Sequence, residues 1–415
     1  MKTENRFIDK IFNLLFITYV CCVYCFDDSK TLNKYTYYAF IAIVLLVIAK
    51  LLFGGKKIGF YKELSPLLLY GSICLLSILW AVYSKSVASK MALTVWQCIG
   101  FTVITTYYFA DRGDNDVIPA AFAIAGLIVS VYVIQTYGGL SQYYAAALRE
   151  NSRLGGEVSQ LNRLGMNAAF SVVAMFFYVI RKKKYYIIPF MIAPGLAAIG
   201  SGSRKALITI VLGVVLQLTF NRNLSADILK RIVSLLVIAA IVVGVGNYVI
   251  KLPVMHNINE RMIGMFEMIK GEKGDNSSNV RKKMMQVGLK AFIQKPVFGY
   301  GVNNARYINK EYVGRFTYLH NGYVENLVNV GLIGSLPFYL MLISLLVKHF
   351  KYVRAGKKNM ILAFSFLCVF FINEFGMVSY YSKGTYIFLT YWITDAIIER
   401  NKNVKEISET LETPD

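Results

Sequence analysis

Residues 251–280 read KLPVMHNINERMIGMFEMIKGEKGDNSSNV, and the polar stretch that they open continues to Leu319. Long apolar runs precede and follow it. Charged side chains and irregular backbone at this density cannot be satisfied in the hydrocarbon of a bilayer. We therefore expect this interval to lie in water beside a membrane domain, and it is the first place to look for residues that carry chemistry.

The composition of the chain favours a polytopic membrane protein. Of its 415 residues, 56% are hydrophobic and 17% are charged, which is far from the average of soluble domains. The formal net charge of +21 would suggest nucleic acid as a partner of a soluble protein, but cytoplasmic loops of membrane proteins also collect Lys and Arg. Because no basic patch is interleaved with stacking aromatics, we expect no nucleic-acid partner.

The predicted fold is all-α with about twelve transmembrane helices, because apolar runs long enough to span a bilayer, or nearly so, recur along the chain. They lie at residues 7–26, 35–53, 64–83, 91–110, 117–137, 164–180, 185–200, 205–220, 232–250, 321–347, 359–378 and 384–399. The predicted parts are helices 1 to 9 within residues 1–250, a long external loop with an amphipathic helix at 251–319, helices 10 to 12 within 320–400 and a tail at 401–415.

The distribution of Lys and Arg predicts the orientation of these helices. With the N-terminus inside, the short internal loops such as 181–184 and 348–358 are rich in cations, and the external loops carry fewer. This asymmetry fits the positive-inside rule, so both termini are expected in the cytoplasm. The loop 138–163, the connection 201–204 and the interval 251–319 then share the outer face.

Arg204 lies between two short apolar runs, close to membrane depth, where an uncompensated charge costs about 2.5–3.5 kcal/mol. It could snorkel to the lipid headgroups. However, Gly200, Gly202 and Ser203 offer backbone N–H groups and a hydroxyl at a helix start. Such a start favours an anion such as phosphate.

Two further arginines, Arg153 and Arg163, stand in a loop on the same predicted face. Either one alone would be an ordinary surface charge. A guanidinium fork, however, donates two parallel hydrogen bonds to two phosphate oxygens. Several arginines from separate loops therefore make phosphate binding the sharper hypothesis.

The long interval contains a predicted amphipathic helix over 280–294, which carries Arg281 and is expected to lie on the membrane domain. The segment 295–301 must then turn. Its Gly299 and Gly301 allow close approach of another backbone, although a Gly-x-Gly pair alone is a weak signal.

His320 and Asn321 open the tenth predicted helix, and Glu325 stands one turn further on. His320 lies at the junction of the aqueous interval and the outer leaflet, unlike His256 and His349. It could simply cap the helix. A neutral imidazole, with an unperturbed pKa of about 6.5, is also suited to general-base work at physiological pH.

Motifs for several other chemistries are missing from the sequence. We find no convincing pair of outward carboxylates for a glycosidase, no Asp-x-Asp that suggests a metal-bound nucleotide sugar, and no His-Glu-x-x-His or Gly-x-Ser-x-Gly. The sequence predicts no metal and no cofactor. A cationic site with one titratable base suits a substrate that already bears an anionic leaving group.

Several of these motifs occur together, in this order: Gly200–Ala206, Arg281 ahead of Lys295–Gly301, His320–Asn326 and Gly331–Gly334. In this order and on these positions they closely resemble the bacterial O-antigen ligase and polymerase superfamily. The resemblance extends over roughly Arg153 to Pro337 and includes the overall number of helices.

The resemblance implies a metal-independent, inverting glycosyltransferase of the GT-C type in the inner membrane of a bacterium. Its donor would be a polyprenyl-diphosphate-linked oligosaccharide, and its acceptor a glycan or a lipid-linked glycan. A chain-length regulator protein is a further candidate partner.

Carried over to the matching positions, the resemblance assigns roles to individual residues. Arg153, Arg204 and Arg281 would bind the diphosphate, with Arg163 a weaker candidate. His320 would be catalytic, and we expect Glu325 to orient it. The supporting residues are Ser203, Asn321, Gly299 and Gly301.

The leading hypothesis is a polymerase that joins lipid-linked repeat units of a surface polysaccharide such as O-antigen, capsule or exopolysaccharide. The close alternative is a ligase that moves the finished glycan to lipid A-core or another acceptor, and the shared motifs do not separate the two. A polysaccharide or lipid transporter is the second alternative. A non-catalytic scaffold of a polysaccharide assembly complex is the third.

Overall fold

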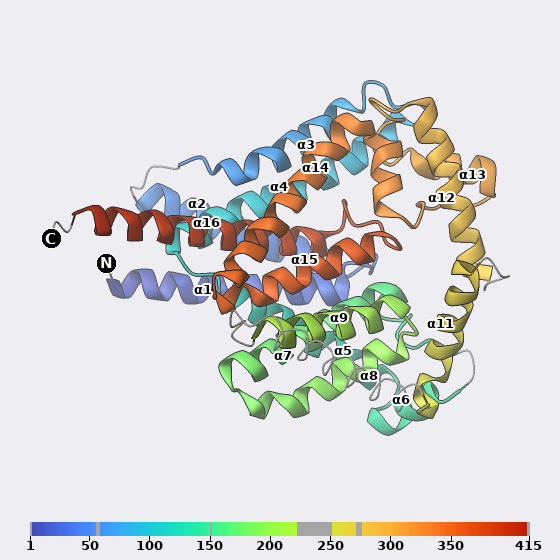
Figure 1. Cartoon of the computed structure of the whole chain (residues 1–415), viewed down its shortest axis with the longest axis horizontal. Helices are drawn as coiled ribbons and strands as arrows, with labels where there is room; N and C mark the ends of the chain where they lie inside the picture. The colour runs from blue at the N-terminus through green and yellow to red at the C-terminus, as the bar shows by residue number, and fades with distance from the viewer. Residues whose placement is uncertain (1, 55–58, 150–151, 222–250, 271–275, 413–415) are drawn as a thin grey trace, which may run out of the picture. The chain divides into compact units, whose positions relative to one another are not determined.

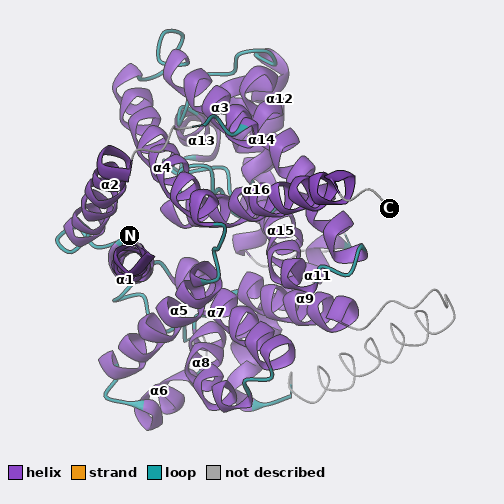
Figure 2. Ribbon diagram, turned by 90° about the vertical axis from the view of Figure 1, so that its left-hand side faces the viewer, coloured by secondary structure: helices purple, strands orange, loops and turns teal. Residues whose placement is uncertain are grey.

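A computed structural model describes residues 2–54, 59–149, 152–221, 251–270 and 276–412. Within these ranges the chain forms helices joined by loops and contains no strand (Figures 1 and 2). The predicted all-α class is thus confirmed for the described part of the chain. The predicted helix at 232–250 lies outside it.

The helices fall into two compact units. Unit 1 comprises residues 1–43, 116–279 and 350–373, and unit 2 comprises residues 44–115, 280–349 and 374–415. The helices of unit 1 are α1 (Lys2–Phe26), α5 (Val117–Thr136), α6 (Leu140–Ala147), α7 (Leu161–Lys182), η2 (Tyr185–Met191), α8 (Ile192–Gly200), α9 (Arg204–Asn221), η3 (Pro253–Met255), α11 (His256–Ile269) and η4 (Lys358–Met360).

Unit 2 holds η1 (Lys62–Leu64), α3 (Ser65–Leu76), α4 (Lys85–Arg112), α13 (Ala305–Val313) and α16 (Lys383–Glu412). Four helices contain the points at which the chain passes from one unit to the other: α2 (Lys34–Gly54), α12 (Asn276–Gln294), α14 (Gly322–Arg354) and α15 (Ile361–Glu374). The interval 251–319 therefore holds three α-helices, where the sequence predicted one amphipathic helix.

Seven of the described helices are long and apolar enough to cross a membrane: α1, α2, α4, α5, α7, α9 and α14. They support the prediction of a polytopic membrane protein. Other predicted spans coincide with shorter or partly polar helices, namely 64–83 with α3, 185–200 with η2 and α8, 359–378 with α15, and 384–399 with the first part of α16. The described residues therefore support seven of the twelve predicted spans by length and composition.

In unit 1, α7 packs against α5, α8 and α9, and α1 packs against α5. Small side chains allow this close approach, as is common between membrane helices. A cluster of buried alanines joins α7, α8 and α9, and it consists of Ala168, Ala169, Ala197, Ala198 and Ala206. At the start of α7, a Cβ on Gly165 would collide with Ser201 and Ser203. This glycine therefore lets the connection between α8 and α9 lie against α7.

In unit 2, α4 packs against α3 and α16. Buried hydroxyls link α4 to α16: Thr102 Oγ1 donates to the Tyr386 carbonyl at 3.0 Å, and the hydroxyls of Thr105 and Thr390 lie 3.1 Å apart. Each of these polar atoms is satisfied within the helix pair, which is the condition for burying it between membrane helices.

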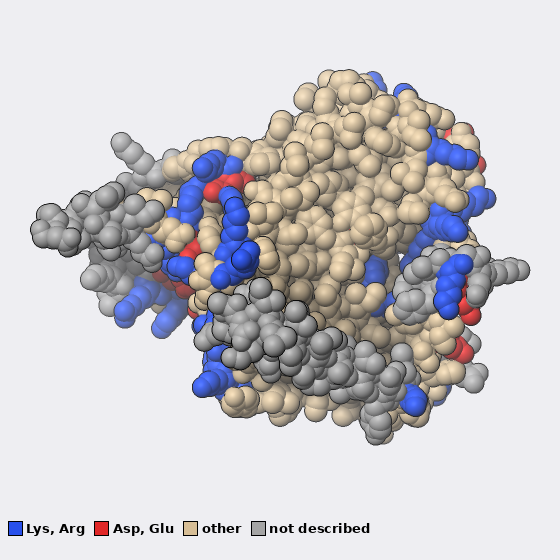
Figure 3. Space-filling model, viewed as in Figure 1, with Lys and Arg blue, Asp and Glu red and all other residues tan. Residues whose placement is uncertain are grey.

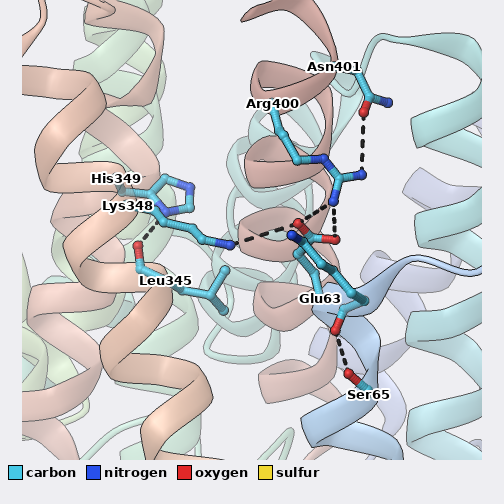
Figure 4. Close-up of polar contacts among 8 residues, drawn as sticks. Glu63, Ser65, Leu345, Lys348, His349, Arg400 and Asn401 are labelled. Carbon is cyan, nitrogen blue, oxygen red and sulfur yellow. Dashed lines mark hydrogen bonds and ion pairs between the residues drawn. The ribbon is translucent and has the colours of Figure 1, made fainter. Parts of the chain in front are cut away.

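A polar cluster joins η1, α14 and α16 near the C-terminal end of α14 (Figure 4). The buried carboxylate of Glu63 accepts hydrogen bonds from Arg400 Nη1 at 2.7 and 2.9 Å and lies 3.8 Å from Lys348 Nζ. His349 is fully buried, and its Nδ1 lies 2.8 Å from the Leu345 carbonyl. Because the buried charge is compensated by its neighbours, we interpret this cluster as a structural junction.

At its other end, α14 is interrupted at Gly331, whose backbone has φ 63° and ψ −166°. The segment 296–301 lies against the interruption and is hydrogen-bonded to α14 on both sides of it. The N–H groups of residues 300–301 donate to the carbonyls of 328–329, at 2.8 Å each, and the N–H groups of 332–333 donate to the carbonyls of 296–297, at 2.9 and 3.2 Å. The backbone groups freed by the interruption are therefore paired, as an apolar environment requires.

The glycines on both sides of this contact permit it. Gly299 has φ 66°, and a Cβ there would collide with the backbone of residues 328–329. Gly301 has φ 93°, and its Cβ would collide with Ala81. A Cβ on Gly331 would collide with the Val297 carbonyl. The segment 295–301 is thus fitted to α14 through its backbone.

Substituting Gly331 with alanine is expected to destabilise the protein strongly. The φ and ψ of this residue lie in a region that costs a residue with a Cβ about 1–3 kcal/mol, and the collision with Val297 adds to that cost. The measurement is the temperature at which half of the purified protein stays monodisperse in detergent. Gly100→Ala is the matched control, because no atom lies within 4 Å of a Cβ there. Equal midpoints for the two variants would show that the break does not need a glycine.

Candidate functional site

The turn Ser201–Ser203 connects α8 to α9, one of the helices long and apolar enough to cross a membrane. Gly202 has φ 62°, a left-handed conformation that glycine adopts readily. The hydroxyl of Ser201 donates to the Ala198 carbonyl at 2.7 Å and accepts the Ser203 N–H at 3.2 Å. The turn is therefore fastened by its own side chain, and α9 begins directly after it with the buried Arg204.

Three arginines gather at this turn. Arg153 Nε donates to the Ser201 carbonyl at 2.9 Å, and Arg261 Nη1 donates to the Gly202 carbonyl at 2.5 Å. Arg204 Nη1 donates in turn to the carbonyl of Arg261 at 2.6 Å. The acceptors of these hydrogen bonds are neutral backbone carbonyls, which do not cancel the charges of the arginines. The turn therefore holds several positive charges close together. An anion with several oxygens would be attracted there and could accept charge-assisted hydrogen bonds.

Two buried hydroxyls accompany the arginines. Ser203 Oγ and the Tyr143 hydroxyl are buried and have no hydrogen-bond partner among the described residues. A Cβ on Gly200 would meet the Tyr143 hydroxyl, so this hydroxyl lies against the end of α8. Burial raises the pKa of Tyr143, which keeps the phenol a neutral donor. Because a buried donor without an acceptor is costly, these groups also favour an anionic ligand.

Arg163 is engaged elsewhere in unit 1. Its Nη1 lies 2.9 Å from Asp27 and 2.8 Å from Asp28. Asp28 also accepts a hydrogen bond from Ser159 Oγ at 2.7 Å. Two carboxylates therefore compensate the charge of Arg163. Of the two loop arginines, Arg153 is the one that contacts the turn.

In unit 2, His320 stands directly before α14 and has φ 58°. Positive φ is uncommon for a residue with a side chain, although His, Asn and Asp tolerate it better than others, and it is found most often at functional sites. The next residue caps the helix, since Asn321 Oδ1 accepts the Val324 N–H at 3.0 Å. The ring of Tyr318 lies 4.2 Å from the His320 ring, centroid to centroid.

Glu325 is fully buried one turn into α14. Its Oε2 accepts the Leu319 N–H at 2.6 Å, and its Oε1 accepts Asn329 Nδ2 at 3.4 Å. The carboxylate therefore holds the backbone one residue before His320. The expected orientation of His320 by Glu325 stays a prediction.

Asn329 connects this carboxylate to its surroundings. Its Nδ2 also donates to the Tyr380 hydroxyl at 3.1 Å, and its Oδ1 accepts the Ala305 N–H at the start of α13, at 2.9 Å. The loop before α14, the start of α13 and the loop after α15 are thereby linked through one buried amide.

The remaining predicted residues lie on the interval 251–319. Arg281 is half-buried on α12, three residues after Ser278, whose hydroxyl accepts Arg204 Nη2 at 3.2 Å. Gly299 and Gly301 contact the backbone of α14 and of Ala81, as described above. Their contribution is to the packing of the segment that precedes α13.

Sequence reasoning missed Arg261 and Asn329. Arg261 lies in the interval 251–319, but one arginine on an amphipathic helix carries no signal of its own. Asn329 could have been found, because it stands four residues after Glu325 and therefore on the same side of α14.

Among the described residues, no group of three or more His, Cys, Asp and Glu side chains could hold a metal ion.

Residues 189–339 match the protein-family model described as O-antigen ligase. No curated protein matches the chain. The matched region contains Arg204, Arg261, Arg281, His320 and Glu325, and it begins after Arg153.

The family match confirms the resemblance drawn from the motifs and indicates glycosyl transfer of the O-antigen ligase or polymerase type. Over residues 189–339 the chain is therefore similar to the O-antigen ligase family.

Proposed function

We propose that this protein is a glycosyltransferase that polymerises oligosaccharide repeat units carried on a polyprenyl diphosphate. The family match supports the type of reaction. The observation that carries the class of donor is the gathering of Arg153, Arg204 and Arg261 at one turn, beside two buried hydroxyls. A diphosphate has the negative charge that such a group of arginines attracts, and it has acceptor oxygens for the two hydroxyls.

In the proposed reaction, a hydroxyl oxygen of the acceptor sugar attacks the anomeric carbon of the donor, with inversion. A new glycosidic bond forms, the bond from that carbon to the diphosphate oxygen breaks, and polyprenyl diphosphate leaves with the bonding electrons. The arginines stabilise the negative charge that develops on the leaving group, and this electrostatic stabilisation replaces a general acid. From the resemblance, Arg281 is assigned to the same diphosphate.

His320 is proposed to take the proton of the attacking hydroxyl. Its backbone is held on one side by the Asn321 cap and on the other by the hydrogen bond from Leu319 to Glu325. A base held in place in this way does not need to be ordered in each cycle, which lowers the entropic cost of reaching the transition state. We further propose that the reaction takes place on the outer face of the inner membrane, with both termini in the cytoplasm.

Polymerase and ligase differ in the acceptor, so the acceptor provides the test. We would reconstitute the purified full chain in vesicles with a polyprenyl-diphosphate-linked repeat unit as the only glycan. A polymerase yields a ladder of longer glycans that stay on the lipid carrier. A ligase yields no ladder, and transfers glycan only after lipid A-core or another acceptor is added. The surface glycan of a strain without the gene provides a second test. Loss of a polymerase should leave single repeat units, whereas loss of a ligase should leave long chains that are not attached to their acceptor.

The transporter alternative makes the opposite prediction in the same vesicles. If the lipid-linked glycan crosses the bilayer and no new glycosidic bond forms, the proposed function is wrong. The arginines at the turn would then mark an anion pathway.

A further inference from the structure

The stretch from Asn276 to Lys310 contains no Asp or Glu. It carries the basic residues Arg281, Lys282, Lys283, Lys290, Lys295, Arg306 and Lys310. All five lysines of this stretch, Lys282, Lys283, Lys290, Lys295 and Lys310, are exposed. Figure 3 shows Lys and Arg side chains gathered over α12 and α13, and a surface free of charged side chains over α3 and the middle of α14. This end of unit 2 is therefore suited to an anionic partner.

The same part of the surface is also apolar. On α12, Leu289 is 40% exposed and Ile293 is 74% exposed, while the opposite side of the helix is buried through Met284 and Ala291. After the helix, Val297 is 48% and Phe298 is 51% exposed. Large exposed apolar side chains between lysines are typical of a surface that meets the headgroup region of a membrane.

A cavity opens within this surface. Its volume is about 510 Å³, and it is lined by Trp80, Lys295, Pro296, Val297, Phe298 and Gly299. Trp80 Nε1 donates to the Phe298 carbonyl at 2.9 Å, and the two rings meet edge-on at 5.3 Å. The aromatic wall is thus fixed by its own hydrogen bond. The volume of the cavity lies within the range of small-molecule sites, and its lining is apolar except for one lysine.

The cavity adjoins an apolar face of α14. Residues 296–297, which line it, are hydrogen-bonded to residues 332–333 of α14. Leu332 and Ile333 are themselves 40% and 42% exposed, and below them the exposed apolar residues of α14 continue with Leu336, Leu340, Ile343 and Val347. The cavity is therefore continuous with a surface suited to lipid chains.

From these observations we infer that this surface is a binding site for an anionic phospholipid. Lys295, which lines the cavity, binds the headgroup phosphate, and one acyl chain enters the cavity beside Trp80 and Phe298. The exposed Lys290 of α12 adds positive charge to the same surface. The apolar lining disfavours free phosphate or a bare sugar, and the lysines select against a zwitterionic lipid. The inference does not depend on glycosyl transfer, because no role in that reaction is proposed for Lys290, Lys295, Trp80 or Phe298.

The test is lipid retention by the purified full chain in detergent, followed by native mass spectrometry. Phosphatidylglycerol is compared with phosphatidylcholine of the same acyl chains. The double variant Lys290→Gln and Lys295→Gln is expected to bind phosphatidylglycerol roughly 25-fold more weakly, since each lysine near an anionic surface contributes about fivefold. Lys310→Gln, which removes the same charge from α13, is the matched control and is expected to bind as the parent protein does.

A second measurement locates the acyl chain of the bound lipid. Phosphatidylglycerol with brominated acyl chains is expected to quench the fluorescence of Trp80, and the quenching should vanish in Trp80→Phe. Inorganic phosphate should not displace the lipid. The inference fails if the two lipids bind equally well, or if the double variant binds like Lys310→Gln. Displacement of phosphatidylglycerol by a tenfold lower concentration of a polyprenyl phosphate would also overturn it and assign the cavity to the donor lipid.

Discussion

Replacing His320 with asparagine is expected to abolish glycosidic bond formation, with a rate roughly 10²–10⁴-fold lower, which is the usual contribution of a general base. Asparagine is the informative substitute because it tolerates the left-handed backbone at this position, where φ is 58°. His320→Ala should lose activity to the same extent, but it also strains the backbone. The measurement is the initial rate of glycan extension in the reconstituted vesicles.

The control for this prediction is His256→Asn. His256 is exposed and lies 3.3 Å from Glu260 on the same helix, and no role in the reaction is proposed for it. Its variant should work at the parental rate. If His320→Asn is inserted in the membrane normally and keeps more than a tenth of the parental rate, His320 is not the base, and the proposed base must be sought elsewhere.

Replacing Arg204 with alanine is expected to lower the rate about 10²–10³-fold, which is typical for the loss of one donor to a developing negative charge. Arg204 is 8% exposed and is held by the Arg261 carbonyl and the Ser278 hydroxyl. Arg204→Lys keeps the charge and loses the planar fork, so an intermediate rate is expected. The rate and the binding of the lipid-linked donor should be measured separately.

The other arginines of the turn provide a graded series. Arg153→Ala and Arg261→Ala should each weaken the reaction less than Arg204→Ala, because each contacts the turn from a half-buried position. Arg149→Ala, an exposed arginine of the loop before Arg153, should have no effect. A parental rate and parental donor binding in Arg204→Ala would contradict the diphosphate site. Unfolding temperatures of all variants distinguish loss of a ligand contact from loss of the fold.

The position of most helices could be predicted from the sequence, because apolar runs of sufficient length have few other uses. The lengths of the membrane-spanning helices could not be predicted from the sequence. Residues 64–83 form one apolar run, but the helix ends at Leu76, and Trp80 instead donates to a carbonyl 218 residues away. Nothing local to residues 77–84 encodes that contact. It depends on the shape of the segment 296–301.

Residues of the candidate site could be predicted where their type is rare for their position in the sequence. Residues whose type is common at such a position could not be predicted. Arg204 and His320 stand out because charge and imidazole are rare beside apolar runs. Arg261 resembles any arginine on an amphipathic helix, and its approach to Gly202 follows from tertiary packing. The resemblance made Arg163 the weaker candidate, but its ion pairs could not be predicted, since the aspartates that pair with Arg163 lie more than a hundred residues earlier.

The interruption of α14 at Gly331 has a mechanical consequence. The tilt of a membrane helix changes with the thickness of its bilayer, and a continuous α14 would transmit that change to its first residue. Here residues on both sides of Gly331 are hydrogen-bonded to the segment 296–301, through the carbonyls of 328–329 and the N–H groups of 332–333. We therefore expect this segment to carry a change in tilt across the break, so that the start of α14 beside His320 responds to the thickness of the surrounding lipid.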